Sequence, residues 1–119
     1  MADLAPVFAR LRALLADDPT PLAVVTDEPE HFYANTTQTD AKGRPVFWGS
    51  VKVSKTKVLF HLMPVYCYPE LLDDASPTLK KRMQGKSCFN FTKVDEALFA
   101  ELATLVIQSR GRYRSEGQM

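Results

Sequence analysis

Aromatic and histidine side chains gather in the middle of this 119-residue chain, on segments rich in strand-forming residue types. Such rings can close around a small molecule, with a hydroxyl, imidazole or ammonium group fixing its orientation. The residues that could line a ligand-binding cavity of this kind are Tyr33, Trp48, His61, Tyr66, Tyr68 and Lys86. The sequence favours the alternative, a sheet that packs these rings into its core with tyrosine hydroxyls at the rim, because strand register cannot be read from a sequence.

Carboxylates in the first third of the chain form a second candidate site. Their oxygen atoms suit hard cations such as iron or calcium. The candidate metal ligands are Asp17, Asp18, Asp27, Glu28, Glu30 and His31. No spacing such as H-x-x-E, H-x-H or C-x-x-C fixes a coordination geometry, and acidic loops are usually only solvated. We therefore expect no cofactor, with iron as the alternative.

No motif in the sequence identifies a catalysed reaction. A nucleophile needs a base and a group that orients the base, and the chain has neither a G-x-S-x-G elbow nor a glycine-rich phosphate loop. If the protein is an enzyme, the best candidates are His61 as proton carrier with Tyr66 or Lys86 assisting. Cys67 and Cys88 are expected to be small buried hydrophobic residues rather than reactive thiols. The sequence thus favours a protein that is not an enzyme.

Composition argues against several classes of partner. The net charge of +1 supplies little of the phosphate neutralisation from which nucleic-acid binding draws its affinity, so the basic run Lys80-Lys81-Arg82 is expected to be solubilising. No stretch approaches the roughly 18 apolar residues that a membrane span needs. The amphipathic N-terminal segment does not resemble a signal peptide. Together with the use of only two cysteines, this predicts a cytoplasmic protein.

Two amphipathic helices are predicted at the ends of the chain. The first begins at Asp3 as N-cap and ends near Asp18, because the prolines that follow cannot continue it. The last is expected to open with Thr92 and Asp95 as a capping box. Three arginines in residues 110–114 would then complement the dipole at its C-terminal end.

The residues between these helices are predicted to build an antiparallel sheet. Phe47 and Trp48 are adjacent on one strand, so their side chains should face opposite sides. Both faces of residues 57–63 are largely apolar, which predicts a strand buried on both sides in the middle of the sheet. The expected elements are strands at residues 31–38, 46–53, 57–63 and 86–91, a brief strand or loop at 22–25, and a short helix from Ser76 to Met83.

The chain length and a content of 45% hydrophobic and 24% charged residues fit one globular domain. Strands joined by hairpin-length connections between two helices indicate an antiparallel arrangement. The predicted fold class is therefore α+β, a two-layer sandwich whose N- and C-terminal helices pack on one face of an antiparallel sheet of about five strands. One domain covers residues 1–119, with a frayed tail after about residue 114.

Two segments in the second half carry a resemblance to a known family. They are Val58-Leu59-Phe60-His61-Leu62-Met63-Pro64 and Gly85-Lys86-Ser87-Cys88-Phe89-Asn90-Phe91, the latter followed by a capped helix. Over roughly residues 45–108 this pattern resembles the YdhG-like bacterial domains of unknown function. The resemblance implies a small α+β protein with helices against an antiparallel sheet.

Some of these relatives are described as frataxin-like intracellular iron chaperones, which hold iron on carboxylates of the first helix and first strand. The resemblance thus implies iron binding by the N-terminal carboxylates named above. The first helix departs from that pattern, because its middle carries Arg10 and Arg12 and no acids.

Three functional hypotheses follow. The leading one is a non-enzymatic binding module for an unidentified ligand or partner, using the sheet face opposite the helices or the cavity between them. The second is iron handling by the N-terminal carboxylates. The third is a protein-interaction or self-association role, including a homodimer, through an exposed sheet edge or an apolar face.

Overall fold

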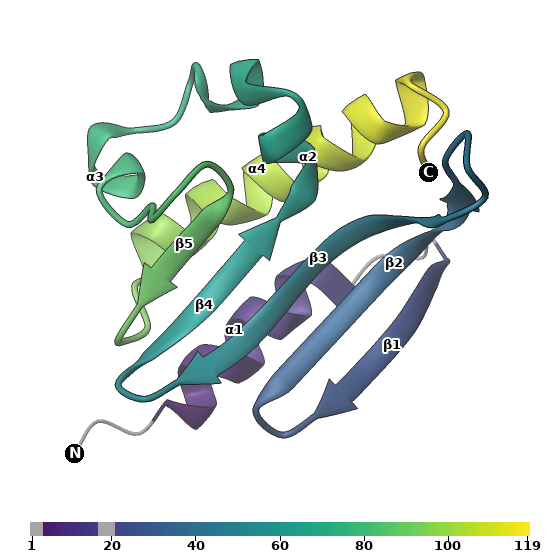
Figure 1. Ribbon diagram of the computed structural model, residues 1–119. Helices are drawn as coiled ribbons and strands as arrows, with labels where there is room; N and C mark the ends of the chain where they lie inside the picture. The colour runs from purple at the N-terminus through teal and green to yellow at the C-terminus, as the bar shows by residue number, and fades with distance from the viewer. Residues whose placement is uncertain (1–3, 17–20) are drawn as a thin grey trace.

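The structure is a computed structural model that describes residues 4–16 and 21–119. Helices and strands follow one another along the chain as a first helix, four consecutive strands, three short helical segments, a fifth strand and a long final helix (Figure 1). Their bounds are α1 Ala5–Ala16, β1 Leu22–Glu28, β2 His31–Thr39, β3 Pro45–Ser54, β4 Lys57–Leu62, α2 Met63–Cys67, η1 Pro69–Leu72, α3 Pro77–Lys80, β5 Cys88–Phe91 and α4 Glu96–Ser115.

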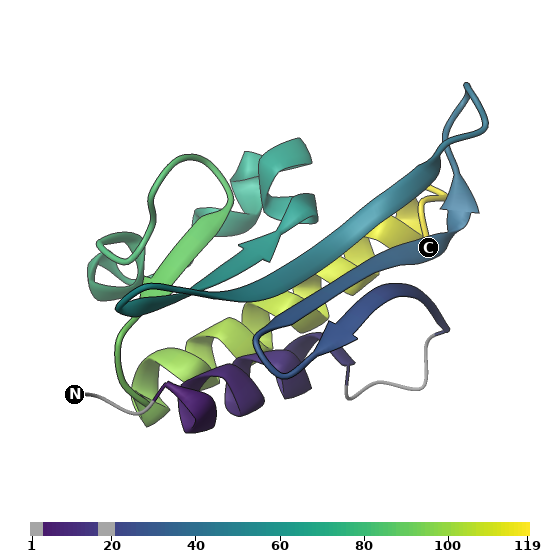
Figure 2. The same ribbon diagram turned by 60° about the horizontal axis from the view of Figure 1, so that its bottom comes forward.

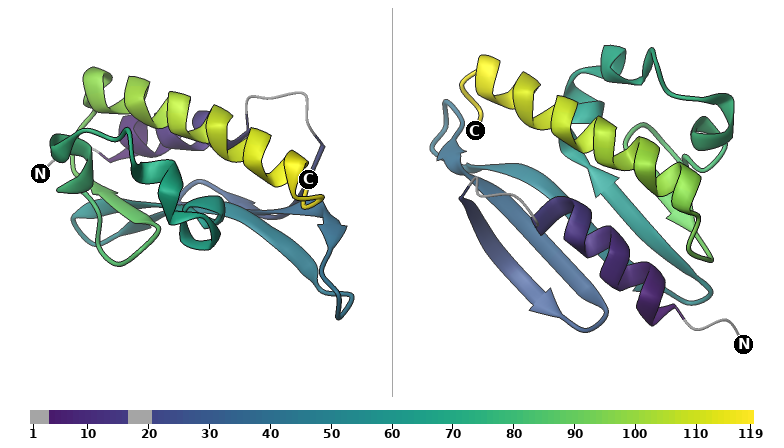
Figure 3. Two further views of the ribbon diagram at one scale, coloured as in Figure 1. Left: turned by 90° about the horizontal axis from the view of Figure 1, so that it is seen from above. Right: turned by 180° about the vertical axis from the view of Figure 1, so that it is seen from behind.

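The five strands form one antiparallel sheet in the order β1-β2-β3-β4-β5. Helices α1 and α4 lie side by side on the same face of this sheet (Figures 2 and 3). The short segments α2, η1 and α3 lie beside the β4–β5 end, where they contact α4. The predicted α+β sandwich with terminal helices on one sheet face is confirmed.

The hydrophobic core lies between the sheet and the two long helices. Alternate residues of the strands point into it, which is the period of two that places every second side chain on one face. From α1 and α4 it takes apolar residues at helical spacing, as the sequence predicts. The fully buried members include Leu11, Leu15, Phe32, Trp48, Val51, Val58, Phe60, Leu62, Phe89 and Leu102.

A β-bulge at Trp48 shapes the centre of the sheet. Ala34 pairs with Gly49 whereas Asn35 pairs with Phe47, so Trp48 is an extra residue in β3. Its side chain is buried toward the helices, while the Phe47 ring contacts rings on the other face. The prediction that these two neighbours face opposite sides is confirmed.

Glycine at position 49 lets α1 approach the sheet closely. A Cβ at this position would lie 2.7 Å from the His61 carbonyl oxygen and 3.2 Å from both methyl carbons of Leu15. Any larger residue would therefore push the end of α1 away from β3 and β4.

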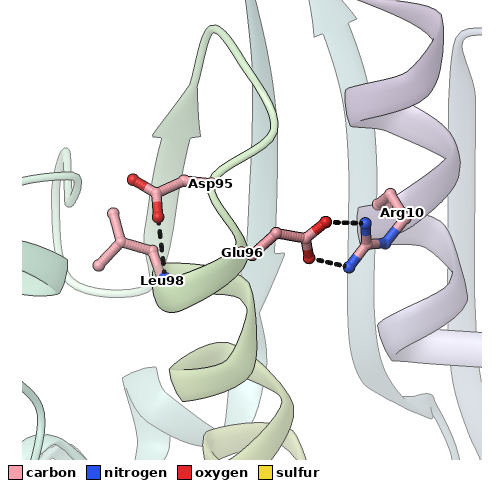
Figure 4. Close-up of polar contacts among 4 residues, drawn as sticks. All are labelled: Arg10, Asp95, Glu96 and Leu98. Carbon is pink, nitrogen blue, oxygen red and sulfur yellow. Dashed lines mark hydrogen bonds and ion pairs between the residues drawn. The ribbon is translucent and has the colours of Figure 1, made fainter.

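The final helix starts later than the sequence suggests. Asp95 has an extended backbone, and its Oδ1 accepts a hydrogen bond from the Leu98 amide at 3.1 Å (Figure 4). Asp95 is therefore the N-cap, and the prediction that Thr92 opens the helix is wrong. The next residue, Glu96, forms a two-bonded ion pair with Arg10 of α1 at 2.6 and 2.7 Å, which links the two helices.

The other predicted helix ends have mixed outcomes. Ser76 caps α3 as predicted, since its hydroxyl accepts from the Leu79 amide at 3.1 Å, but α3 itself ends at Lys80. For α1, the predicted ends Asp3 and Asp18 lie outside the described residues.

Two further predictions are wrong because packing is decided by distant residues. The strand at residues 57–63 is not buried on both sides: in β4, alternate residues stay half-exposed, since helices cover only one sheet face. Of the three arginines predicted to complement the dipole at the C-terminal end of the last helix, Arg112 and Arg114 lie in its last turn, but Arg110 lies before it. It is buried, donates to the Leu15 carbonyl at 2.9 Å, and lies 5.3 Å from the centre of the Trp48 ring.

The C-terminal residues make hydrogen bonds and packing contacts beyond residue 114, where the sequence predicts a frayed tail. Helix α4 runs to Ser115, the Gln118 amide donates to the Tyr113 carbonyl at 2.7 Å, and Met119 packs against the edge of the core. Within residues 4–16 and 21–119, no helix has both the length and the apolar character needed to span a bilayer.

Candidate functional site

The face of the sheet opposite α1 and α4 is the main candidate surface. It is turned toward the viewer in Figure 1, and no helix of the described residues lies across it. Strand pairing sets two rows of side chains across this face. One row is Thr26, Tyr33, Ser50, His61 and Cys88, and the other is Glu28, His31, Lys52, Leu59 and Asn90. We call this surface the open face.

Four ring side chains form a continuous line across the open face. The His31 and Tyr33 rings meet edge to face at a centroid distance of 6.5 Å. Tyr33 stacks on Phe47 at 4.6 Å with an interplanar angle of 16°, and Phe47 meets His61 edge to face at 5.3 Å. All four are half-buried. This ring row (His31, Tyr33, Phe47 and His61) spans three neighbouring strands.

A hydrogen bond fixes one end of the ring row. His61 Nε2 lies 2.7 Å from the Ser87 hydroxyl oxygen, and burial lowers the pKa of His61 below its ordinary value of 6.5. The imidazole is therefore neutral at neutral pH. Ser87 is only 5% exposed, which makes it inaccessible as a nucleophile. The pair thus positions the His61 ring rather than presenting a reactive hydroxyl.

The two cysteines differ in their surroundings. Cys88 is the cross-strand neighbour of His61 and is half-buried, and burial raises the pKa of its thiol. Its thiol is therefore protonated at neutral pH and is a poor nucleophile. Cys67, at the end of α2, is exposed, so the prediction that it is a buried hydrophobic residue is wrong. Both cysteines are free.

The six predicted cavity residues do not converge on one site. Tyr33 and His61 share the open face, whereas Trp48 is fully buried on the other face, with its indole N–H 3.4 Å from the Leu15 carbonyl. Tyr66 is 53% exposed on α2. The remaining two are Tyr68, which packs beneath the Arg112 guanidinium at 4.2 Å, and Lys86, which is exposed beside Ser87.

Three residues that form or hold the ring row are absent from the predicted ligand site. Phe47 was recognised only as facing away from Trp48, and His31 was assigned to the metal site. Ser87 carried no signal at all. A bulge and a cross-strand register place these residues together, and neither can be predicted from a single sequence.

The predicted metal ligands are separated in the described structure. Asp27 forms two hydrogen bonds with the Arg12 guanidinium at 2.8 and 3.0 Å, which lower the pKa of its carboxyl group. Glu28 and Glu30 are exposed, and His31 belongs to the ring row. Asp17 and Asp18 lie outside the described residues.

No group of three His, Cys, Asp or Glu side chains within residues 4–16 and 21–119 is arranged to hold a metal ion. Iron binding stays a prediction.

Two of the cavities among the described residues show what lies away from the open face. One, of about 140 Å³, is a partly open hollow between α4 and the segment from η1 to α3, with Leu71, Leu79 and Leu105 as apolar lining and Glu101 at its side. The other, of about 210 Å³, runs between α1 and α4 along Leu14, Ile107 and Arg110. None of the predicted ligand-site residues lines either cavity.

Comparisons with protein-family models, with curated proteins and with solved structures found no significant match to this chain. The resemblance to the YdhG-like domains therefore stays a prediction that rests on the two segments quoted above.

Proposed function

We propose that the protein is a non-enzymatic binding module and that its open face binds a planar aromatic or heterocyclic group. The observation that supports this is the ring row, in which four rings from β2, β3 and β4 form one contact line on a sheet face that α1 and α4 leave uncovered.

The open face carries more apolar and aromatic side chains than a solvent-exposed sheet face usually does. Antiparallel sheets commonly keep one face in water, and that face usually carries polar side chains. Here Leu59 and four rings occupy it, each half-buried by its neighbours. Ring side chains supply apolar contact area together with polar tips, which suits recognition of a flat partner group.

Polar groups around the ring row would orient such a ligand. The Tyr33 hydroxyl and the two imidazoles can donate or accept hydrogen bonds. Lys52, the cross-strand partner of His31, is exposed and can contact an anionic substituent. A neutral His61, held by Ser87, contributes a fixed ring rather than a charge.

The chemistry of the face supports binding over catalysis. Ser87, which contacts its histidine, is buried, the Cys88 thiol is kept protonated by burial, and its best base, His61, is already hydrogen bonded. Two free cysteines fit a reducing compartment, so we place this activity in the cytoplasm.

The test is a ligand screen by nuclear magnetic resonance on the full chain. The probes are a panel of purine, pyrimidine, indole and flavin compounds, with aliphatic acids and sugars as the comparison panel. We expect heterocyclic probes to shift the resonances of β2, β3 and β4 and the aliphatic probes to leave them unchanged. Tyr33→Ser should weaken binding at least tenfold, whereas Tyr66→Ser, which removes an exposed ring from α2, should not.

The proposal fails if no heterocyclic probe perturbs the open face. It also fails if Tyr33→Ser and Tyr66→Ser bind a hit equally well, because the ligand would then sit elsewhere on the molecule.

A further inference from the structure

A hollow beside α4 combines apolar walls with carboxylates. The segment from η1 to α3 runs along one flank of this helix (Figure 3). One end of the segment is fixed by an ion pair between Glu70 and Arg112 at 2.9 Å. The other end is fixed where the Ser76 amide donates to Glu101 Oε2 at 3.2 Å. Between these two contacts, residues 71–75 leave a space of about 140 Å³ against the helix, which we call the α4 hollow.

The inner part of the α4 hollow is apolar. Leu79 and Leu105 are 1% and 4% exposed and form its deepest wall, and the half-buried Leu71 and Ala75 also line it. Water finds few hydrogen-bonding partners against such a wall, whereas an alkyl chain gains apolar contact there. Since an apolar cavity of about 150 Å³ holds one benzene molecule, the α4 hollow has room for about six non-hydrogen atoms.

The charges of the α4 hollow lie nearer its mouth. Asp74 is exposed and Glu101 is half-buried, and both line the space. Within residues 4–16 and 21–119, neither carboxylate forms an ion pair with Lys or Arg. Glu101 has a second oxygen with which it can accept from a ligand. Of the described residues that line the hollow, none is basic, so its mouth is negatively charged and complements a cation.

We propose that the α4 hollow binds a small free amine, a primary alkylammonium ion with a short unbranched chain. The chain enters first and packs against Leu79 and Leu105, and the ammonium group stays at the mouth with Asp74 and Glu101. This orientation removes the chain from water while the charge stays paired and hydrated.

The same arrangement separates a free monoamine from other cations. Within the described residues, no group of three His, Cys, Asp or Glu side chains is placed to hold a metal ion. A lysine side chain of a protein partner would enter with its ammonium group first and bring the charge against the apolar wall, which costs free energy. A diamine of similar length meets the same cost, because it carries a charge at both ends.

The test is nuclear magnetic resonance of the full chain at neutral pH, following the methyl groups of Leu79 and Leu105. The probe is n-pentylamine, and the comparison ligands of matched chain length are 1-pentanol, pentanoate and 1,5-diaminopentane. We expect pentylamine to shift these methyl resonances and to bind about fivefold more tightly than pentanol, because it adds one partly exposed ion pair. Pentanoate and the diamine should bind more weakly than pentylamine. Added salt should weaken pentylamine but not pentanol.

Three variants locate the site and its charge. Glu101→Gln keeps an oxygen for the Ser76 amide but removes the charge, so it should weaken pentylamine about fivefold and leave pentanol unchanged. Ala75→Met places a longer side chain in the α4 hollow and should weaken both ligands. The matched control is Glu30→Gln, which removes an exposed carboxylate from the turn between β1 and β2 and should bind like the wild type.

The inference is overturned if pentylamine leaves both methyl groups unshifted or binds no better than pentanol. It is also overturned if the diamine binds as tightly as pentylamine, if Glu101→Gln and Glu30→Gln bind alike, or if Ala75→Met binds like the wild type. The α4 hollow is separate from the open face, so a failed heterocycle screen leaves this inference standing.

Discussion

The Ser87 hydroxyl oxygen lies 2.7 Å from His61 Nε2 and so joins the loop before β5 to the last ring of the ring row. The Ser87 carbonyl also accepts from the Leu62 amide at 3.0 Å, which fixes the serine backbone against β4. His61 is thereby held between Phe47 on one side and Ser87 on the other. Its burial in this position makes its protonation state matter for folding.

We predict that acidification through the titration range of His61 destabilises the protein. Burial lowers the pKa of His61 below 6.5, so above that pH both the folded and the unfolded imidazole are neutral and this contribution to stability is complete. As pH falls below 6.5, the unfolded chain takes up a proton that the native state resists, and the free energy of unfolding declines. Urea unfolding followed by Trp48 emission on both sides of pH 6.5 measures this decline.

The matched variants are His61→Gln and His31→Gln. Glutamine at 61 cannot take up the proton, so that variant should lose part of the decline, while His31→Gln keeps His61 and should retain it. An unfolding free energy that rises on acidification, or an equal decline in wild type and His61→Gln, would contradict the assignment.

Gly49 is predicted to be intolerant of any side chain. A Cβ there would meet the His61 carbonyl at 2.7 Å, and backbone cannot move aside as a side chain can. Overpacking of this kind costs about 1–3 kcal/mol, so Gly49→Ala should lower the free energy of unfolding by that amount. Chemical unfolding monitored by Trp48 emission measures the loss.

Gly111 supplies the control. It lies exposed in α4, and an added Cβ would meet nothing within 4 Å. Because glycine weakens a helix interior relative to alanine, Gly111→Ala should stabilise the protein by about 0.5–1 kcal/mol. Opposite signs for the two changes would support the close approach of α1 to the sheet, and equal effects would exclude it.

Local signals in the sequence predicted the architecture well. Amphipathic spacing located α1 and α4, strand-forming residue types and the turns between them located β2 to β4, and Ser76 marked the start of α3. These features depend on residues close together in the chain, where propensity and side-chain direction suffice.

What the sequence could not predict depends on distant partners. Arg110 lies 95 residues from Leu15, yet their hydrogen bond decides that this arginine is buried. The bulge at Trp48 decides that Phe47, rather than Trp48, joins Tyr33 and His61. Both outcomes arise from tertiary packing, so of the ring row only Tyr33 and His61 could be assigned to a ligand site from the sequence.

The start of α4 offers a test of helix capping. Asp95 Oδ1 accepts from the Leu98 amide, which satisfies one of the amides left without a helical partner. Asp95→Ala should therefore cost about 1 kcal/mol of stability. Thr92→Ala, which removes the side chain that the sequence pattern named as the cap, should cost less, because Thr92 is exposed and precedes the helix. Thermal unfolding of the two variants separates the assignments, and a larger loss in Thr92→Ala would reverse them.

Tyr113 links the final helix to the bulge that orients the ring row. Its hydroxyl donates to the Phe47 carbonyl at 2.9 Å, and burial raises the pKa of Tyr113 far above its ordinary value, so the hydroxyl keeps its proton. Tyr113→Phe removes this donor while keeping the ring, and a lost hydrogen bond of this type costs about 1 kcal/mol. Tyr66→Phe is the control, since its ring is 53% exposed and its loss of a hydroxyl should leave stability unchanged.

The same pair of variants connects this hydrogen bond to binding. If the Phe47 backbone sets the position of its ring against Tyr33 and His61, Tyr113→Phe should also weaken a heterocyclic ligand of the open face, although Tyr113 lies on the opposite side of the sheet. Unfolding curves and ligand titrations on one set of samples measure both effects. Equal stability of Tyr113→Phe and Tyr66→Phe would show that the Phe47 carbonyl does not depend on α4, and the ring row would then be held by the sheet alone.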